Sequence, residues 1–366
     1  MNIHACKNLS YLPHGPPNLV SLEYLSVSEC PNLETLPSLD NLKFLSELHI
    51  HNCDALTSAL NGLESCTSLR SMNIHACKNL SYLPHGPQTL VSLEYLSVRD
   101  CPSLETLPSL DNLKFLSELH IHNCDALTSA LNGLESCSSL RSMNIHACKN
   151  LSYLPRGPQT LVSLEHLSVR DCPSLETLPS LDSPTTLSEL HIHNCDGLTS
   201  LPNGLASCMS LSSLTIWKCR KLQQFLTGLH CITESKIGGL WEELDFFPSF
   251  PNFTQLERLT LCGWPKLKSL PQELQYCTSL RFLYIASFNG VESFPEWLGD
   301  LTSLQLLNIK SCKNLMHLPT AKATQRLTKL KTLAIYDCPR LKERCTNERG
   351  PEWPKISHIP IIFVMD

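Results

Sequence analysis

The sequence lacks the segments that would place the protein in a membrane or export it from the cell. None of the apolar runs in its 366 residues reaches the length of about 18 residues that a membrane-spanning helix needs. The N-terminus has no charged start followed by an apolar stretch, which is the pattern of a secretory signal. We therefore expect a cytoplasmic protein with no membrane partner.

Charge is scarce as well. Asp, Glu, Lys and Arg together make up 17% of the residues, and the formal net charge is −5 at pH 7. Surfaces that bind nucleic acid need clustered Lys and Arg. The composition therefore predicts no nucleic-acid partner.

The motifs that position phosphates, metals or nucleophiles are also missing. The sequence contains no G-x-x-x-x-G-K-[ST], G-x-G-x-x-G, H-E-x-x-H or G-x-S-x-G. The carboxylates of Glu47, Glu118 and Glu189 recur, but they are copies of one position and form no pair at an obvious site. We expect a protein that is not an enzyme, with no catalytic residue, cofactor or resident metal.

Repetition is what the sequence has in abundance, and it occurs at two scales. Residues 1–71, 72–142 and 143–213 are near-identical blocks, each beginning with Met-Asn-Ile-His-Ala-Cys. Within them lies a unit of 23 or 24 residues with the frame L-x-x-L-x-(I/V/L)-x-x-C-x-x-L, often followed by x-x-L-P. Its positions are numbered from the first leucine, and it occurs 15 times, with sixth positions at Ile3, Val27, Ile50, Ile74, Val98, Ile121, Ile145, Val169, Ile192, Ile216, Ile237, Leu261, Ile285, Ile309 and Ile335.

This frame is that of a leucine-rich repeat. Inward and outward residues alternate from position three to position seven, which is typical of a short strand. The proline-rich segments at residues 13–18 and 84–89 cannot lie inside a helix. Since one unit cannot bury its own leucines, the units must stack.

We therefore predict an α/β-type repeat solenoid, a horseshoe with a concave parallel sheet of about 15 short strands and a convex side of loops and 3₁₀ turns. Residues 1–341 would form the solenoid, with 214–341 as divergent repeats. Residues 342–366 would form a C-terminal capping tail.

The 19 cysteines raise the question of metal binding, because each block contains a His-x-Cys such as His4 and Cys6. Position seven should point outward and position nine inward, so the two side chains should not share a metal. Cysteine is often buried and carries a weak S–H donor. The ladder of position-nine residues predicts buried, reduced thiols at Cys6, Cys30, Cys53, Cys77, Cys101, Cys124, Cys148, Cys172, Cys195, Cys219, Cys312 and Cys338.

The outward positions supply the candidate binding residues. Histidine and arginine columns at position seven are either a polar solvated face copied by duplication, which we favour, or a surface that responds to pH or metal. Further along, aromatic and basic residues at positions three, five and seven are typical of binding hot spots. The predicted partner-binding residues are Trp217, Lys236, Arg258, Phe282, Tyr284, Lys310, Lys331, Tyr336, His51, His75, Arg99, His122, His146, Arg170 and His193.

The C-terminal segment supports a family resemblance. It reads C-P-x-L-x-x-R-C from Cys338, then Gly350, Trp353-Pro-Lys-Ile and His358-Ile-Pro. With the repeat frame, this resembles the leucine-rich-repeat region of plant intracellular NB-ARC disease-resistance proteins, especially the coiled-coil class. Glu352 stands where an Asp is common in that family. Trp353, Ile356 and Ile359 are suited to cap the last repeat.

The resemblance implies a recognition module of plant innate immunity. Its partner would be a pathogen effector, a guarded host protein or its own NB-ARC domain, and it would restrain a nucleotide-binding switch. The coiled-coil and NB-ARC parts are missing from this sequence. Met1 occupies position four of a repeat, so we expect a fragment or a truncated gene product. The alternative is a free-standing leucine-rich-repeat scaffold or a remnant without signalling function.

Overall fold

A computed structural model describes most of the chain. The described residues are 1–12, 19–36, 38–57, 60–83, 90–128, 131–154, 161–181, 186–222, 229–240, 250, 253–345 and 350–366. The predicted loops at residues 13–18 and 84–89 lie outside these ranges. None of the helices in the described ranges has the length and apolar character needed to cross a bilayer.

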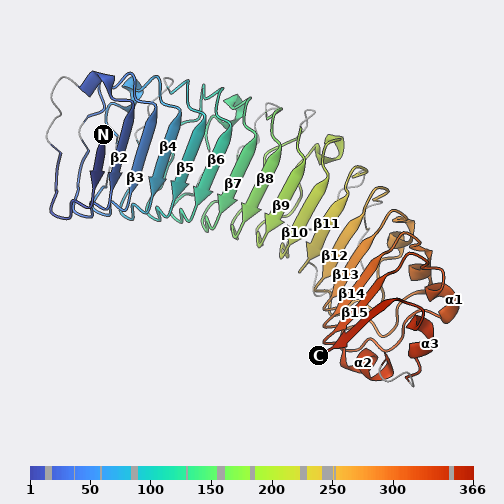
Figure 1. The fold of residues 1–366 in the computed structure, drawn as a ribbon. Coiled ribbons are helices and arrows are strands. Elements are labelled where there is room, and N and C mark those ends of the chain that lie inside the picture. The colour runs from blue at the N-terminus through green and yellow to red at the C-terminus, as the bar shows by residue number, and fades with distance from the viewer. Residues whose placement is uncertain are drawn as a thin grey trace. The chain divides into compact units, whose positions relative to one another are not determined.

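The repeats form short parallel strands that follow one another in the sheet in chain order (Figure 1). Fourteen cover positions three to seven of the predicted repeats and the first strand covers positions five to seven, so the predicted fold class is confirmed. The strands are β1 (Asn2–His4), β2 (Tyr24–Ser28), β3 (Glu47–His51), β4 (Ser71–His75), β5 (Tyr95–Arg99), β6 (Glu118–His122), β7 (Ser142–His146), β8 (His166–Arg170), β9 (Glu189–His193), β10 (Ser213–Trp217), β11 (Glu234–Gly238), β12 (Arg258–Cys262), β13 (Phe282–Ala286), β14 (Leu306–Lys310), β15 (Thr332–Tyr336) and β16 (Ile361–Met365).

The chain divides into two compact units. The first comprises Met1–Leu187 and Asn194–Cys208, and the second comprises Ser188–His193 and Met209–Asp366. Strands β1 to β8 belong to the first unit and β9 to β16 to the second.

The strands are in register because the same frame position pairs in each of them. In the first unit Leu48 of β3 lies between Leu25 of β2 and Met72 of β4, and Ile50 follows the same pattern. Leu48 and Ile50 are at most 1% exposed, while Glu47 is exposed. The alternation arises because successive strand side chains point to opposite faces.

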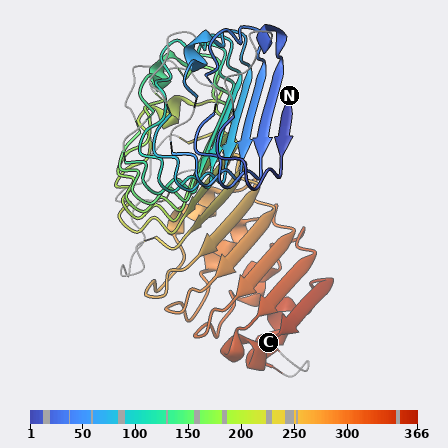
Figure 2. The same cartoon turned by 90° about the vertical axis from the view of Figure 1, so that its left-hand side faces the viewer.

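Turns and short 3₁₀ helices form the other side of the repeats, as Figure 2 shows for the first unit. Gly62, directly before one such helix, has φ 84°, which favours glycine. An added Cβ there would collide with the backbone nitrogen of Asp40 in the preceding repeat. The short helices are η1 (Leu19–Ser21), η2 (Leu63–Ser65), η3 (Leu134–Ser136), η4 (Leu205–Ser207), η5 (Gln272–Tyr276), η6 (Glu296–Asp300) and α1 (Ala321–Thr324).

The position-nine cysteines lie inward, as the sequence predicts. Cys101 and Cys124 are fully buried, and each S–H donates to a position-seven carbonyl, that of Arg99 at 3.3 Å and that of His122 at 3.3 Å. Desolvation raises the pKa of the Cys124 thiol. All 19 cysteines are free thiols. Burial and the raised pKa both keep the Cys124 thiol in the unreactive protonated form.

Cys6 departs from that prediction, because it is exposed. Ile3 is only partly buried, since β1 is an edge strand of the sheet. Among the described residues, no cluster of three or more His, Cys, Asp or Glu side chains could hold a metal.

The C-terminal tail closes the last repeat with more structure than the sequence predicts. It contains α2 (Pro339–Cys345) and α3 (Trp353–Ile356), and then β16, which pairs with β15 in parallel. Ile356 and Ile359 are buried as predicted, while Trp353 remains partly exposed. The sequence did not predict β16, because its isoleucine-rich segment lies outside the repeat frame.

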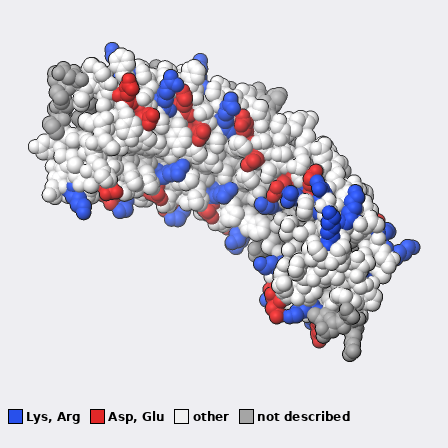
Figure 3. Space-filling view, in the orientation of Figure 1, with Lys and Arg blue, Asp and Glu red and all other residues white. Residues whose placement is uncertain are grey.

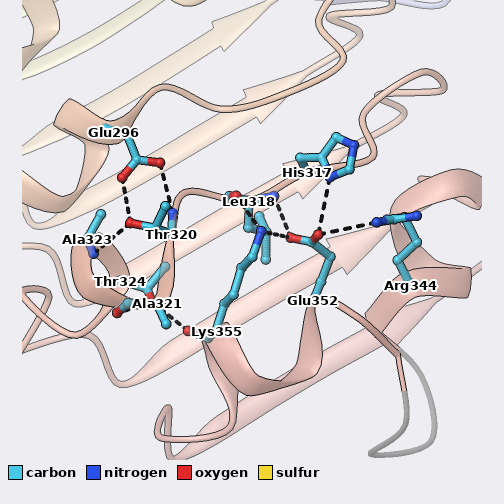
Figure 4. A network of polar contacts seen from close by, with 10 residues as sticks. All are labelled: Glu296, His317, Leu318, Thr320, Ala321, Ala323, Thr324, Arg344, Glu352 and Lys355. Atoms are coloured by element: carbon cyan, nitrogen blue, oxygen red, sulfur yellow. Dashed lines mark hydrogen bonds and ion pairs between the residues drawn. The ribbon is translucent and has the colours of Figure 1, made fainter.

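Glu352 is the unexpected member of this cap, because its side chain is only 2% exposed. Its carboxylate accepts hydrogen bonds from Nζ of Lys355 at 2.7 Å and from the backbone N–H of Leu318 at 2.8 Å (Figure 4). Nδ1 of His317 lies 3.3 Å away and Nη2 of Arg344 lies 3.6 Å away. The carboxylate therefore joins the tail to the preceding repeats.

Candidate functional site

The exposed face of the strands carries a groove in each unit. In the first unit, position seven contributes a row of imidazoles, and we call this surface the histidine groove. Its volume is about 780 Å³. Its lining consists of Tyr24, Ser26, Ser28, His49, Ile50, His51, Asn73, Ile74, His75, Tyr95, Ser97, Arg99, Asp100, His122, Asn123, His146 and Ala147.

The histidines meet in cross-strand pairs because neighbouring strands place position seven side by side. The rings of His51 and His75 stack, with centroids 4.5 Å apart and planes 8° apart. The copied pair, His122 and His146, meets edge to face at 5.4 Å. The structure thus brings together five predicted residues of this face, namely these four histidines and Arg99.

Position eight adds polar groups that the sequence analysis did not select. Asp100 and Asn123 follow their strands with φ 53° and 55°, in the left-handed region that Asp and Asn tolerate. Oδ2 of Asp100 lies 2.8 Å from Nε2 of His75, and Oδ1 accepts a hydrogen bond from Asn123 at 2.8 Å. The hydrogen bond from Asn123, followed by that from His75, lowers the pKa of Asp100. The recurrence of Asn and Asp directly after the strands is the sequence feature that could have identified these residues.

Two imidazoles of this groove have lowered pKa values. Desolvation, followed by the positive charge of Arg99, lowers the pKa of His122 to about 4. Desolvation and the neighbouring His75 lower the pKa of His51. These two histidines are therefore neutral at pH 7 and act as hydrogen-bonding rings rather than as cations. Figure 3 shows that basic and acidic side chains both occur on the first unit, with other residues between them.

The second unit carries a smaller groove of about 440 Å³ with a different chemistry, which we call the basic groove. Strands β11 to β14 line it with Glu234, Ser235, Lys236, Arg258, Thr260, Tyr284, Ile285, Ala286, Asn308 and Lys310. Four predicted residues therefore meet here: Lys236, Arg258, Tyr284 and Lys310. A fifth, Phe282, supports the groove from β13, because the guanidinium carbon of Arg258 lies 4.3 Å from its ring centre.

The remaining predicted residues are not among those that line either groove. Arg170 and His193 lie at position seven of β8 and β9, and Tyr336 lies at position seven of β15. The indole of Trp217 lies over Gly238 of the next strand, where an added Cβ would come within 2.7 Å of the ring. Because Gly238 has no side chain, the indole can lie against this strand.

The prediction that Lys331 occupies an outward strand position is wrong. It is exposed, but it lies directly before β15, and the outward residue at position three of that strand is Thr332. Because Ile335 is the sixth position of that repeat, Lys331 falls at position two.

Two models of known protein families match parts of this chain. The family model for plant disease-resistance proteins of the RPS2-like type, leucine-rich repeats, matches residues 128–228. The family model R13L1/DRL21 LRRs matches residues 268–338. The chain is a leucine-rich-repeat region like those of plant disease-resistance proteins.

Individual relatives agree with this assignment. This leucine-rich-repeat region is 34% identical over 92 residues to disease resistance protein RPS4B of Arabidopsis thaliana, an alignment that covers 25% of this chain and 7% of the relative. It is 42% identical over 67 residues to disease resistance protein RPP4 of the same plant, covering 18% of this chain and 6% of the relative. The chain thus spans a small fraction of the length of these relatives.

Solved structures match the fold alone. An LRR protein of Leptospira interrogans, LIC12759, superposes with a TM-score of 0.53 at 18% identity, covering 96% of this chain and 93% of that one. TLR13 in its complex with ssRNA13 superposes with a TM-score of 0.56 at 17% identity, covering 93% of this chain and 54% of that one.

Proposed function

We propose that this leucine-rich-repeat region is a protein-recognition module of plant innate immunity that binds its partner through the exposed face of the sheet. The observation that carries the proposal is the basic groove, where an exposed tyrosine and three cationic side chains lie on adjacent strands. Tyrosine and arginine are enriched among residues that dominate binding energy. The resemblance to plant disease-resistance proteins supports a partner that is a pathogen effector or a guarded host protein.

The rigidity of the surface supports this proposal. Each strand inside the sheet carries its outward side chains on a backbone fixed by hydrogen bonds to both neighbours, as β13 is between β12 and β14. A surface that is already ordered loses little conformational entropy when a partner docks. The face therefore needs no rearrangement to bind.

In a longer receptor, the same region would also restrain a nucleotide-binding switch in the resting state, in the cytoplasm. The relatives extend well beyond the matched segment, which leaves room for such a domain in them. We place this contact on the same recognition face, so that partner binding and restraint compete.

Photo-crosslinking in plant cells tests the recognition face. A photoreactive residue replaces Tyr284, and the expected result is a crosslinked protein that disappears when Trp217→Ala and Tyr336→Ala are added. The matched control places the same group at Tyr276, which is 60% exposed but lies on η5, away from the strands. An equal set of crosslinked proteins from both positions would refute a specific face.

A further inference from the structure

We infer that the basic groove takes an acidic segment of a partner protein, with carboxylates that meet Lys236, Arg258 and Lys310. This inference rests on the proposed function and names the chemistry of the partner. The lining contains three cationic side chains and one carboxylate, that of Glu234. The chain as a whole carries a net charge of −5, so this local excess of positive charge runs against the composition.

Within the part of the chain that the structure describes, the cations of the groove are only weakly neutralised. Nζ of Lys236 lies 3.5 Å from Glu234, and both side chains are about half exposed, so their attraction is weak. In the described part of the chain no carboxylate lies within ion-pair distance of Arg258 or Lys310. Arg258 instead rests on the ring of Phe282, which holds its position but leaves its charge available.

The other polar groups of the groove also favour an acceptor-rich partner. Tyr284 is 37% exposed and presents a phenolic hydroxyl, and Thr260 and Asn308 present a hydroxyl and an amide. Each of these can donate a hydrogen bond to a carboxylate. Hydrogen bonds between such donors and an ionised acceptor are stronger than neutral ones.

The register of strands β11 to β14 determines how far apart the three cationic side chains lie. Lys236 lies at position five of β11, Arg258 at position three of β12 and Lys310 at position seven of β14. Lys236 and Lys310 are separated by three strand spacings, about 14 Å, and by two residues along the strand, so their Cα atoms lie roughly 16 Å apart. An extended peptide covers that distance in about five residues. A partner peptide with acidic residues about five positions apart therefore fits this groove, with its middle over Tyr284.

The histidine groove serves as an internal contrast. It lies on the same repeat frame, but its lining contains one arginine and one aspartate, Arg99 and Asp100, and His122 is neutral at pH 7. The two grooves therefore differ in charge while they share strand geometry, so acidic selectivity belongs to the second unit. Lysine and arginine at these positions, rather than the solenoid itself, determine it.

Fluorescence anisotropy with labelled poly-glutamate tests the inference on the whole chain. We expect binding at low ionic strength that weakens as salt is added. R258A/K310A should lower the affinity about tenfold, equivalent to about 1.4 kcal/mol. The matched control, K313A/K329A, removes the same charge from exposed positions that do not line the groove and should change the affinity less than about twofold.

Charge reversal provides the converse test. The variant R258E/K310E should no longer bind poly-glutamate and should bind poly-lysine instead. The inference is overturned if both double-alanine variants weaken poly-glutamate equally, if poly-glutamate does not bind, or if a single-stranded DNA oligonucleotide binds more tightly with the same dependence on Arg258 and Lys310. If the crosslinked partner at Tyr284 persists in R258A/K310A, recognition through this face stands and the acidic partner is refuted.

Discussion

Replacing Glu352 should loosen the C-terminal cap, because this carboxylate is buried among four polar partners. Glu352→Ala removes the acceptor for Lys355 and for the N–H of Leu318, and it leaves the Lys355 ammonium, whose side chain is 23% exposed, without its carboxylate. Removing one partner of a buried ion pair costs about 3 to 5 kcal/mol. Glu352→Gln keeps the shape and some hydrogen bonds, so about 1 to 3 kcal/mol is expected.

Hydrogen exchange measures this effect where it should appear. Exchange of the amides in α3 and β16 should accelerate in both variants, and more in Glu352→Ala, while β2 to β7 should remain unchanged. Glu292→Gln is the matched control, because Glu292 is exposed and its backbone carbonyl rather than its carboxylate carries the hydrogen bonds to Met316 and His317. Equal protection of β16 in the Glu352 and Glu292 variants would show that the buried carboxylate does not hold the cap.

The pH dependence of the same contact has a definite sign. Burial by itself raises the pKa of Glu352, but hydrogen bonds from Lys355 and from the N–H of Leu318 outweigh it and lower the pKa overall. A depressed pKa in the folded state means that the carboxylate contributes stability above its unfolded pKa, and this contribution disappears as the pH falls through the folded value. The faster exchange of β16 should therefore also appear in the wild-type protein in acid.

Three further predictions concern the first unit. Leu96→Ala should cost about 2 to 5 kcal/mol in urea unfolding, because Leu96 is fully buried in the stack, and a loss below about 0.5 kcal/mol would contradict that packing. Gly62→Ala should cost more than about 1 kcal/mol, because φ is 84° and the new Cβ meets Asp40; an unchanged midpoint would refute the turn geometry. His122 should titrate in NMR with a pKa of about 4, and Arg99→Ala should raise it. Because that pKa is depressed by folding, His122 should lower stability progressively as pH falls from about 6.5 towards 4.

Sequence periodicity predicted the strands well, because buried residues recur at every second position and successive side chains of a pleated strand point to opposite faces. Leu48 and Ile50 must face inward if their repeat is to bury anything, so their positions could be read directly. The prediction was wrong at Lys331, which lies at position two of its repeat, directly before β15. Glu352 shows a second failure, because a buried carboxylate depends on partners from segments far apart in the sequence, such as Leu318.

The candidate binding face could be predicted only in part. Positions three, five and seven were identified as outward, and Arg258, Tyr284 and Lys310 do line one groove. The cluster itself, and the contact of Arg258 with Phe282, required the strand register. Asp100 was missed because its role follows from a left-handed turn that brings its carboxylate to His75.

The amino-acid sequence by itself determined the repeat, the inward leucine and cysteine ladders and the resemblance to plant disease-resistance proteins. These features depend on local alternation and on the need of each unit to share its core with neighbours. Tertiary structure alone decided which outward side chains meet, which histidines are neutral and how the tail closes the last repeat. Those outcomes depend on distances across strands and on desolvation, which arise only when residues remote in the sequence are brought together.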